Sequence, residues 1–227
     1  SEVNPKLILP TKYSHLYSER LDSFYINLEN DLEILRKKIS KRKRSFIKLD
    51  KFNAEFRVAE KVEKEYFFPL YKNFMDSINA SEYSNLNESA INSFLNLNNN
   101  ILFLIKIDQK ILLMHLIGIN QNTKTADFVF SASSEECYYL GYTMIWNEIC
   151  FLKSIGYKKF YLGGGIKRND GVENFKKKMG GEIIFNGGIK LILDKVQYEK
   201  EANSYLEENY NSFFPVYLRD QFLSNKR

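Results

Sequence analysis

The chain has 227 residues, of which 44% are hydrophobic and 27% charged, and its formal net charge is +5. This composition is typical of a globular protein and excludes a disordered tail. The two cysteines, Cys137 and Cys150, cannot form a disulfide framework and favour a reducing, cytoplasmic compartment. The two histidines, His15 and His115, lie too far apart for a zinc-binding motif, so we expect no metal site.

The sequence predicts neither a membrane-spanning helix nor a signal peptide. The most apolar stretch, residues 101–119, is interrupted by Lys106, Asp108 and Lys110, which a transmembrane helix would not carry at its centre. Residues 1–10 lack a charged segment followed by an apolar one, so we expect no leader sequence.

The positive charge is concentrated in residues 36–44, RKKISKRKR, where seven of nine residues are basic. One interpretation is a solvated helix end, because cations are favourable near a helix C-terminus. The other is a binding site for a diphosphate, a nucleotide or an anionic lipid. No zinc finger, basic zipper or RNP motif accompanies this segment, so we do not expect sequence-specific DNA binding.

The first part of the chain is predicted to be mainly helical. Apolar residues recur at three- and four-residue steps from residue 13 to residue 43. The predicted elements are a helix over 13–43, a short strand over 45–49, a helix over 60–79 that breaks or kinks at Pro69, and a helix over 88–95.

The pattern is clearer after residue 100. The predicted elements are strands 101–107, 111–119 and 125–131, helix 134–154, strand 158–162, helix 171–178, and strands 182–185 and 189–193 paired across the turn 186–188. Ser133 or Ser134 can cap the long helix and Gly156 ends it, and the tail from Lys195 reads as a polar helix.

This order of elements predicts an α/β (α+β) fold with a mixed, mostly antiparallel sheet flanked by helices on both faces. We expect an N-terminal helical part over residues 1–84, packed on the same domain, and a core over residues 85–227. The long helix should deliver the fourth strand parallel to the third. Where these two strands separate, the sheet should open into a crevice, which is the predicted site.

Three consecutive glycines, Gly163, Gly164 and Gly165, follow the fourth strand of this core. A β–α turn needs one glycine, so three favour close approach of a ligand to the backbone, although a plain turn is the alternative. They match neither the Walker loop nor the Rossmann fingerprint. Arg168 and Asn169 come next, near a predicted helix N-terminus that favours anions.

Several side chains around the crevice have two interpretations. Asp170 is a helix cap or a reacting group, and Phe175 and Lys176 are most simply a core residue and a surface residue. Tyr142 and Tyr161 are packing residues or catalytic hydroxyls. The two cysteines are interpreted as small buried apolar residues.

Residues 139–181 resemble the Fem-type (FemABX-like) branch of the GNAT acyltransferase superfamily. The matching positions are Lys153 and Gly156, the run from Leu162 to Gly165, Asp170 with Gly171, Phe175 with Lys176, and Gly180 with Gly181. The similarity extends over residues 65–185. Two features differ from the related enzymes. Residues 131–141, SASSEECYYLG, replace the loop that holds the coenzyme A pyrophosphate in classical GNAT enzymes. Full-length Fem-type ligases contain two GNAT-like repeats, whereas this chain has room for one unit and an N-terminal helical part.

The resemblance implies an enzyme that transfers an acyl group, acetyl above all, from an acyl-CoA thioester to an amine. It implies catalytic roles for Tyr142, Tyr161 and Asp170, with Glu148 as another possible base. The residues implied for binding the acyl donor are Ser133, Ser134, Gly163, Gly164, Gly165, Arg168, Asn169, Phe175 and Lys176.

The implied acceptor is an amino sugar on a nucleotide or lipid carrier of a cell-envelope polysaccharide, with the basic segment 36–44 binding its diphosphate. One alternative is aminoacyl transfer from aminoacyl-tRNA to a peptidoglycan precursor, and another is a non-catalytic binding module. A monomer and a homodimer both fit the sequence.

Overall fold

The computed structural model describes residues 17–19, 21–80, 85–165, 167–189 and 191–202. They belong to two compact units, and the larger one consists of Leu21–Ala80 and Asn85–Ile184. No helix among the described residues is both long enough and apolar enough to cross a lipid bilayer.

The larger unit contains seven strands, β2 (Ser23–Asn27), β3 (Ala54–Val58), β4 (Asn100–Ile107), β5 (Lys110–Asn120), β6 (Thr125–Ser133), β7 (Lys159–Gly164) and β8 (Glu182–Ile184). Its α-helices are α1 (Leu32–Lys38), α2 (Phe67–Ser77), α3 (Glu88–Leu95), α4 (Gly141–Ser154) and α5 (Gly171–Lys178). Its 3₁₀ helices are η2 (Lys41–Phe46), η3 (Asp50–Phe52), η4 (Lys61–Tyr66) and η6 (Glu135–Leu140). In the smaller unit, β1 (Tyr17–Glu19) pairs antiparallel with β9 (Gly187–Ile189), and α6 spans Lys195–Ala202.

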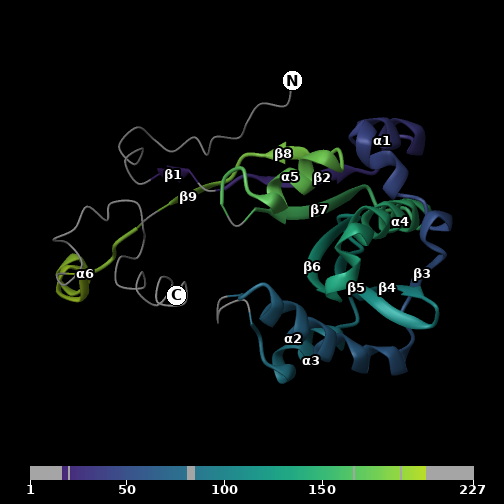
Figure 1. Ribbon diagram of the computed structural model, residues 1–227. Helices are drawn as coiled ribbons and strands as arrows, with labels where there is room; N and C mark the ends of the chain where they lie inside the picture. Colours follow the sequence, from purple (N-terminus) through teal and green to yellow (C-terminus); the bar gives the residue numbers. More distant parts are fainter. Residues whose placement is uncertain (1–16, 20, 81–84, 166, 190, 203–227) are drawn as a thin grey trace. The chain divides into compact units, whose positions relative to one another are not determined.

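The seven strands form one sheet in the order β3-β4-β5-β6-β7-β2-β8 (Figure 1). Every neighbouring pair is antiparallel except β6 and β7, which are parallel and connected through α4. This confirms the predicted mixed, mostly antiparallel sheet and the parallel third and fourth strands of the core. Strands from both sides of position 84 contribute to the sheet, because β2 and β3 precede it.

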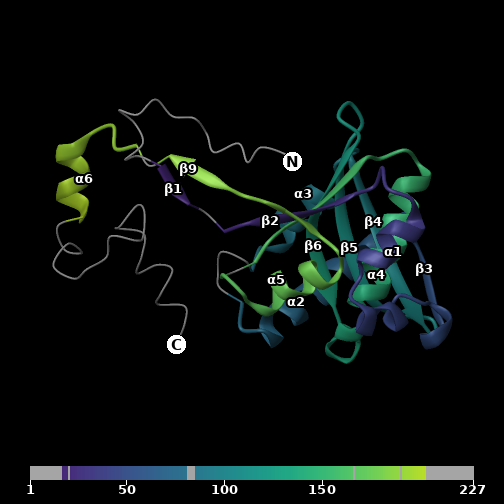
Figure 2. The same ribbon diagram turned by 90° about the horizontal axis from the view of Figure 1, so that it is seen from above.

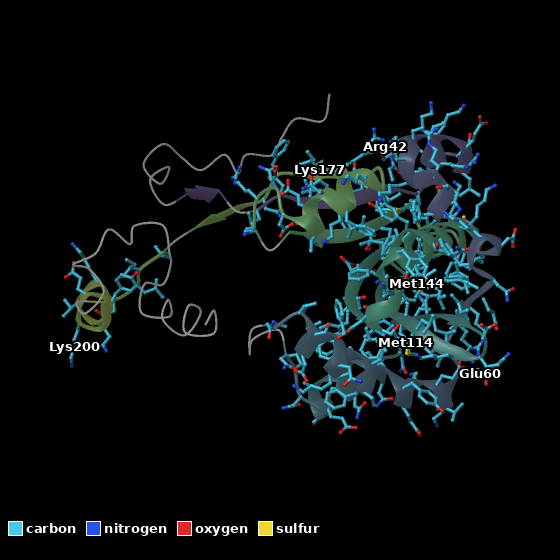
Figure 3. All side chains as sticks on the ribbon, viewed as in Figure 1. Arg42, Glu60, Met114, Met144, Lys177 and Lys200 are labelled. Carbon is cyan, nitrogen blue, oxygen red and sulfur yellow. The ribbon has the colours of Figure 1, made fainter. Side chains whose placement is uncertain are left out.

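Helices cover both faces of the sheet, as Figure 2 shows from above. Alternate side chains of a strand point to opposite faces, so β4 sends Phe103 to one core and Leu104 to the other. The first core lies under α1 and α4 and includes Met144, and the second lies under α2 and α3 and includes Met114 (Figure 3).

From residue 88 to residue 178, most predicted elements are confirmed. Helices α3 and α5 have the predicted bounds, and strands β4 to β7 differ from the predictions by two residues at most. The predicted helix 134–154 is divided into η6 and α4, and neither Ser133 nor Ser134 caps α4, whose N-cap is Leu140. Gly156 follows α4 with φ of 84°, the left-handed conformation predicted for a helix-ending glycine.

The predicted helix over 13–43 is wrong in its described part. Residues Ser23–Asn27 form a strand instead, and only Leu32–Lys38 is α-helical. Strand β2 lies between β7 and β8 and buries Phe24, Tyr25 and Ile26, so pairing with distant strands overrides the helical spacing of its apolar residues.

Three further local predictions are corrected. Residues 45–49 are not a strand, and β3 begins at Ala54 instead. The segment 60–79 changes from η4 to α2 at Phe67, and Pro69 lies within the first turn of α2, where its missing N–H costs no helical hydrogen bond. Residues 182–185 and 189–193 do not form a hairpin, because β8 pairs with β2 whereas β9 pairs with β1.

Candidate functional site

A cavity of about 460 Å³ lies where β6 and β7 separate, and its lining residues all belong to the larger unit. The two strands pair over Thr125–Asp127 and Lys159–Tyr161, after which β6 continues alongside β5 to Ser133. The lining residues are Phe74, Ile78, Leu113, His115, Phe128, Ser131, Ser133, Cys137, Gly141, Ile145, Leu162, Gly171, Val172, Phe175 and Lys176. The crevice predicted at the separating strands is therefore confirmed, and its volume suits a small-molecule site.

Most of the cavity wall is apolar, and a few polar side chains interrupt it. His115 on β5 pairs directly with Ser131 on β6, so both side chains point to the same face of the sheet. Ser133, two residues further along β6, also lines the cavity, as does Lys176 from α5. An apolar cavity with a few convergent polar groups is the usual form of a ligand-binding site.

His115 forms a buried pair with Glu148, which comes from α4. The distance between His115 Nδ1 and Glu148 Oε1 is 2.8 Å, and the two side chains are 6% and 0% exposed. Glu148 Oε2 is buried and makes no hydrogen bond to any residue that the structure describes. A buried carboxylate oxygen without a partner is costly, so such a group calls for a functional explanation.

Lys176 brings a positive charge to the same cavity. Its side chain is buried, and Nζ donates a hydrogen bond to the carbonyl oxygen of Gly164 at 2.5 Å. Burial lowers the pKa of Lys176, and the nearby charge of Asp170 opposes that shift. An ammonium group held by one carbonyl has further donors for a ligand oxygen.

The three consecutive glycines shape the backbone beside the cavity, although none of them lines it. Gly163 has φ of 71°, a conformation that glycine adopts without strain, and it lies at a register shift between β2 and β7. The turn places the carbonyl of Gly164 where Lys176 can reach it. The glycines therefore serve this turn, and their predicted contact with a ligand stays a prediction.

The predicted catalytic tyrosines lie outside the cavity lining. Tyr142 is buried against Phe175, with ring centroids 4.7 Å apart, and burial raises the pKa of its hydroxyl. On β7, Leu162 faces the cavity, so the neighbouring Tyr161 points to the other face of the sheet, where it contacts Tyr25. Catalytic roles for Tyr142 and Tyr161 stay predictions.

Asp170 is the N-cap of α5. Its Oδ1 accepts a hydrogen bond from the backbone N–H of Glu173 at 2.7 Å, and its Oδ2 accepts one from the N–H of Lys167 at 3.0 Å. Arg168 and Asn169 are exposed in the loop just before α5. Of the residues predicted for donor binding, the cavity thus brings together Ser133, Phe175 and Lys176, whereas Ser134, Arg168 and Asn169 do not line it.

The sequence analysis missed His115 as a site residue. A detectable signal existed, because His115 interrupts an otherwise apolar strand and Glu148 interrupts the apolar face of the following long helix. Two polar residues on faces that pack together indicate a buried pair.

Exposed basic residues occur on two segments of the same unit that a backbone hydrogen bond joins, and we call this set the basic surface. It consists of Arg36, Lys37, Lys41 and Arg42 on α1 and η2 with Lys177 and Lys178 on α5, all exposed. The backbone N–H of Ser40 donates to the carbonyl of Lys178 at 2.9 Å, which joins the two segments. Arg42 and Lys177 mark this surface in Figure 3.

No protein-family model and no curated protein matches the sequence. Among solved structures, the chain is similar to FemX, with a TM-score of 0.63 and 14% identity over 85% of this chain and 65% of that one. It is also similar to the C-terminal domain of an Agrobacterium fabrum protein assigned as a lysylphosphatidylglycerol synthetase, with a TM-score of 0.57 and 14% identity over 82% and 65%.

A third similar structure is the GCN5-related glucosamine N-acetyltransferase region of a fungal multi-domain GH3 β-N-acetylglucosaminidase. Its TM-score is 0.52 and its identity 9%, over 75% of this chain and 21% of that one. The chain thus spans 65% of the length of FemX. These similarities show that it has the Fem-type, GNAT-like fold that its motifs predicted.

Proposed function

We propose that this protein transfers an acyl group from an acyl-CoA thioester, acetyl-CoA above all, to an amine bound in the cavity. The observation that carries the proposal is the cavity at the separating parallel strands, which combines an apolar wall with a buried histidine–glutamate pair and a buried lysine. One of the similar solved structures is named as a glucosamine N-acetyltransferase region, and the three structures share this fold.

The cavity supplies what acyl transfer needs, because this chemistry depends mainly on positioning two substrates and stabilising charge. The apolar wall around Leu162 and Phe175 suits an acyl chain. Lys176 can donate a hydrogen bond to the carbonyl oxygen on which negative charge develops. Glu135 is exposed at the start of η6, where its carboxylate would repel a pyrophosphate, so the nucleotide end of the donor lies elsewhere.

For the acceptor, we propose an amino sugar carried by a nucleotide or a lipid of the cell envelope. The region named glucosamine N-acetyltransferase among the similar structures supports an amino sugar. The basic surface supports a diphosphate carrier, because clustered Lys and Arg residues attract multiply charged anions.

The first experiment is a calorimetric and thermal-shift titration with acetyl-CoA and with free CoA. A ligand that binds only the folded protein stabilises it by about 2.7 kcal/mol at a hundred times its Kd. Val172→Trp should weaken donor binding by filling the cavity from its exposed rim, where Val172 is 40% exposed. Val58→Trp is the matched control, since Val58 on β3 is 39% exposed and does not line the cavity.

Donor binding would then be followed by transfer assays with UDP-linked glucosamine as the acceptor. Micromolar binding that Val172→Trp weakens and Val58→Trp preserves supports the proposal. If millimolar CoA leaves the melting temperature unchanged, the proposal that a CoA thioester is the donor is overturned.

The basic surface favours one second candidate, aminoacyl transfer from aminoacyl-tRNA. Exposed cations of the basic surface can neutralise RNA phosphates, and such binding weakens steeply with salt. Lys37 and Lys177 already pair with Glu33 and Glu173, so Arg36, Lys41, Arg42 and Lys178 carry this argument. Filter binding of tRNA at salt concentrations from about 50 to about 200 mM tests this candidate, because affinity for nucleic-acid phosphates falls steeply over that range. If the double variant Arg36→Glu, Arg42→Glu loses the salt dependence of tRNA binding, the result supports aminoacyl-tRNA as the donor.

A further inference from the structure

His115 lines the cavity and was not assigned to any step from the sequence, and its partner Glu148 was named there only as another possible base. We propose that His115 Nε2 is the general base that takes the proton from the acceptor amine, with Glu148 as the residue that orients its ring. This inference rests on the proposed acyl transfer and names the group that performs its proton transfer.

Geometry assigns the ring nitrogens. Nδ1 lies 2.8 Å from Glu148 Oε1, so with Glu148 as the acceptor of this hydrogen bond Nδ1 carries the hydrogen. Nε2 then keeps its lone pair and makes no hydrogen bond to any residue in the described part of the chain. Because His115 lines the cavity, this nitrogen is the one left for a substrate.

The surroundings hold the imidazole in place. The ring of Phe128 packs edge-on against it, with centroids 4.8 Å apart, and Glu148 is fully buried behind it. The other titratable groups at the cavity are Lys176 on α5 and Cys137 on η6. Lys176 opposes a second positive charge in the cavity, whereas Glu148 stabilises the imidazolium that forms when Nε2 takes a proton.

The unpartnered oxygen of Glu148 supports a catalytic role over a structural one. A pair kept only for packing would gain from a partner for Oε2, and burial without one lowers stability. The hydrogen bond from Nδ1 to this buried carboxyl group fixes the orientation of the imidazole ring, which a proton-transferring histidine needs.

The proposed step balances without a further reactant. The amine nitrogen forms a bond to the acyl carbon, and the bond from that carbon to the thioester sulfur breaks. The proton leaves the nitrogen for Nε2, and the released thiolate takes up one proton, so the imidazole returns to its neutral form.

Nuclear magnetic resonance of the ring nitrogens tests the assignment without an acceptor. The chain contains two histidines, so a sample labelled with ¹⁵N-histidine shows two ring systems, and His115→Gln identifies which is which. We expect a neutral His115 ring with its hydrogen on Nδ1 at pH 8. A hydrogen on Nε2, or a ring that stays doubly protonated to pH 9, overturns the proposal.

Kinetics tests the role itself. With acetyl-CoA and UDP-linked glucosamine, His115→Ala should lower kcat by 10²–10⁴ while the Kd for acetyl-CoA stays unchanged, because a general base contributes that factor. Added imidazole should restore part of the rate by entering the space left by the ring. His115→Gln, which keeps a donor for Glu148, should be equally slow, and Glu148→Gln should lie between it and the wild type.

The matched control is Glu63→Gln, the same change at another buried carboxylate, which pairs with Arg57 and Lys106 outside the cavity. It should keep the wild-type rate. Histidine variants that stay active, or that stay folded and bind acetyl-CoA but gain nothing from imidazole, overturn the proposal. If the wild type transfers no acyl group, the proposed function fails, and the ring-nitrogen experiment still decides whether the pair presents a basic nitrogen to the cavity.

Discussion

Glu63 and Glu148 are both buried carboxylates, and they differ in the number of their partners. Glu63 accepts hydrogen bonds from Arg57 Nη1 and Nη2 at 2.6 and 2.7 Å and forms an ion pair with Lys106 at 2.5 Å. These contacts, led by the bond from Arg57, lower the pKa of Glu63 to about 2. Within the described part of the chain, Glu148 has one hydrogen-bond partner for its two oxygens.

The lowered pKa of Glu63 predicts a pH-dependent contribution to stability. A carboxylate with a depressed pKa in the folded state stabilises the fold above its ordinary pKa, near 4.5, and this contribution is lost as the pH falls toward 2. Glu63→Gln should lower the free energy of unfolding at pH 7 by roughly 1–2 kcal/mol, after allowance for solvent screening. Urea denaturation of the wild type and of Glu63→Gln at pH 7 and at pH 2.5 measures this effect. If the two proteins differ in stability by the same amount at both pH values, the prediction is wrong.

Gly164 is required by the close approach of Asp22, the residue that precedes β2. A Cβ added there would lie 2.8 Å from the carbonyl oxygen of Asp22, whereas a Cβ at Gly171 meets no atom within 4 Å. Gly164→Ala should therefore reduce the free energy of unfolding by about 1–3 kcal/mol, because the backbone must shift. Gly171→Ala, the matched control at the start of α5, should be neutral or stabilising. Thermal unfolding of both variants tests this difference in stability. Equal transition temperatures for the two variants would disprove the steric argument.

At the scale of elements, α5 depends on its cap. Asp170→Ala removes the acceptor for the N–H of Glu173 and should cost about 0.5–2 kcal/mol, whereas Asp170→Asn keeps an acceptor and should cost a few tenths. The pair of variants also tests the predicted catalytic role. If Asp170 only caps the helix, Asp170→Asn keeps the acyl-transfer rate. A catalytic carboxylate would lose its rate in both variants, and thermal unfolding with rate measurements separates the two outcomes.

The elements that the sequence predicted well are those whose signals are local. Strands β4 and β5 are β-branched runs separated by a polar turn, and α5 has both an N-cap and a terminal glycine. Strand β2 has no such signal, because its apolar residues fit a helical spacing and its partners β7 and β8 lie more than 130 residues away.

The candidate site was predictable in position and only partly in composition. The crevice follows from the order of the elements, so it was expected at the separation of two parallel strands. Lys176 and Phe175 were named through a motif. His115 and Glu148 meet only after β5 and α4 pack together, and separate positions in the sequence do not show that two polar residues will share one hydrogen bond.

At the scale of the molecule, the sheet is completed by residues from distant parts of the chain. Strand β2 fills the place between β7 and β8, and Phe24, Ile26 and Leu28 belong to the same core as α4. The chain must therefore bring β2 to β7 and β8 before this part of the sheet can form, which favours slow folding.

This arrangement predicts that the division of the chain at residue 84 does not give an independent core. A fragment of residues 85–227 would leave β7 and β8 without the strand that joins them. The buried side chains that it would lose include Phe24, Ile26 and Leu28, which each contribute about 1.5–3 kcal/mol. We expect it to lack cooperative thermal unfolding and dispersed amide resonances, whereas a fragment of residues 21–184, the span of the larger unit, should show both. Adding residues 1–84 as a separate peptide should restore cooperative unfolding, because β2 binds through strand pairing. A fragment of residues 85–227 that unfolds cooperatively alone would show that β2 is dispensable for the core.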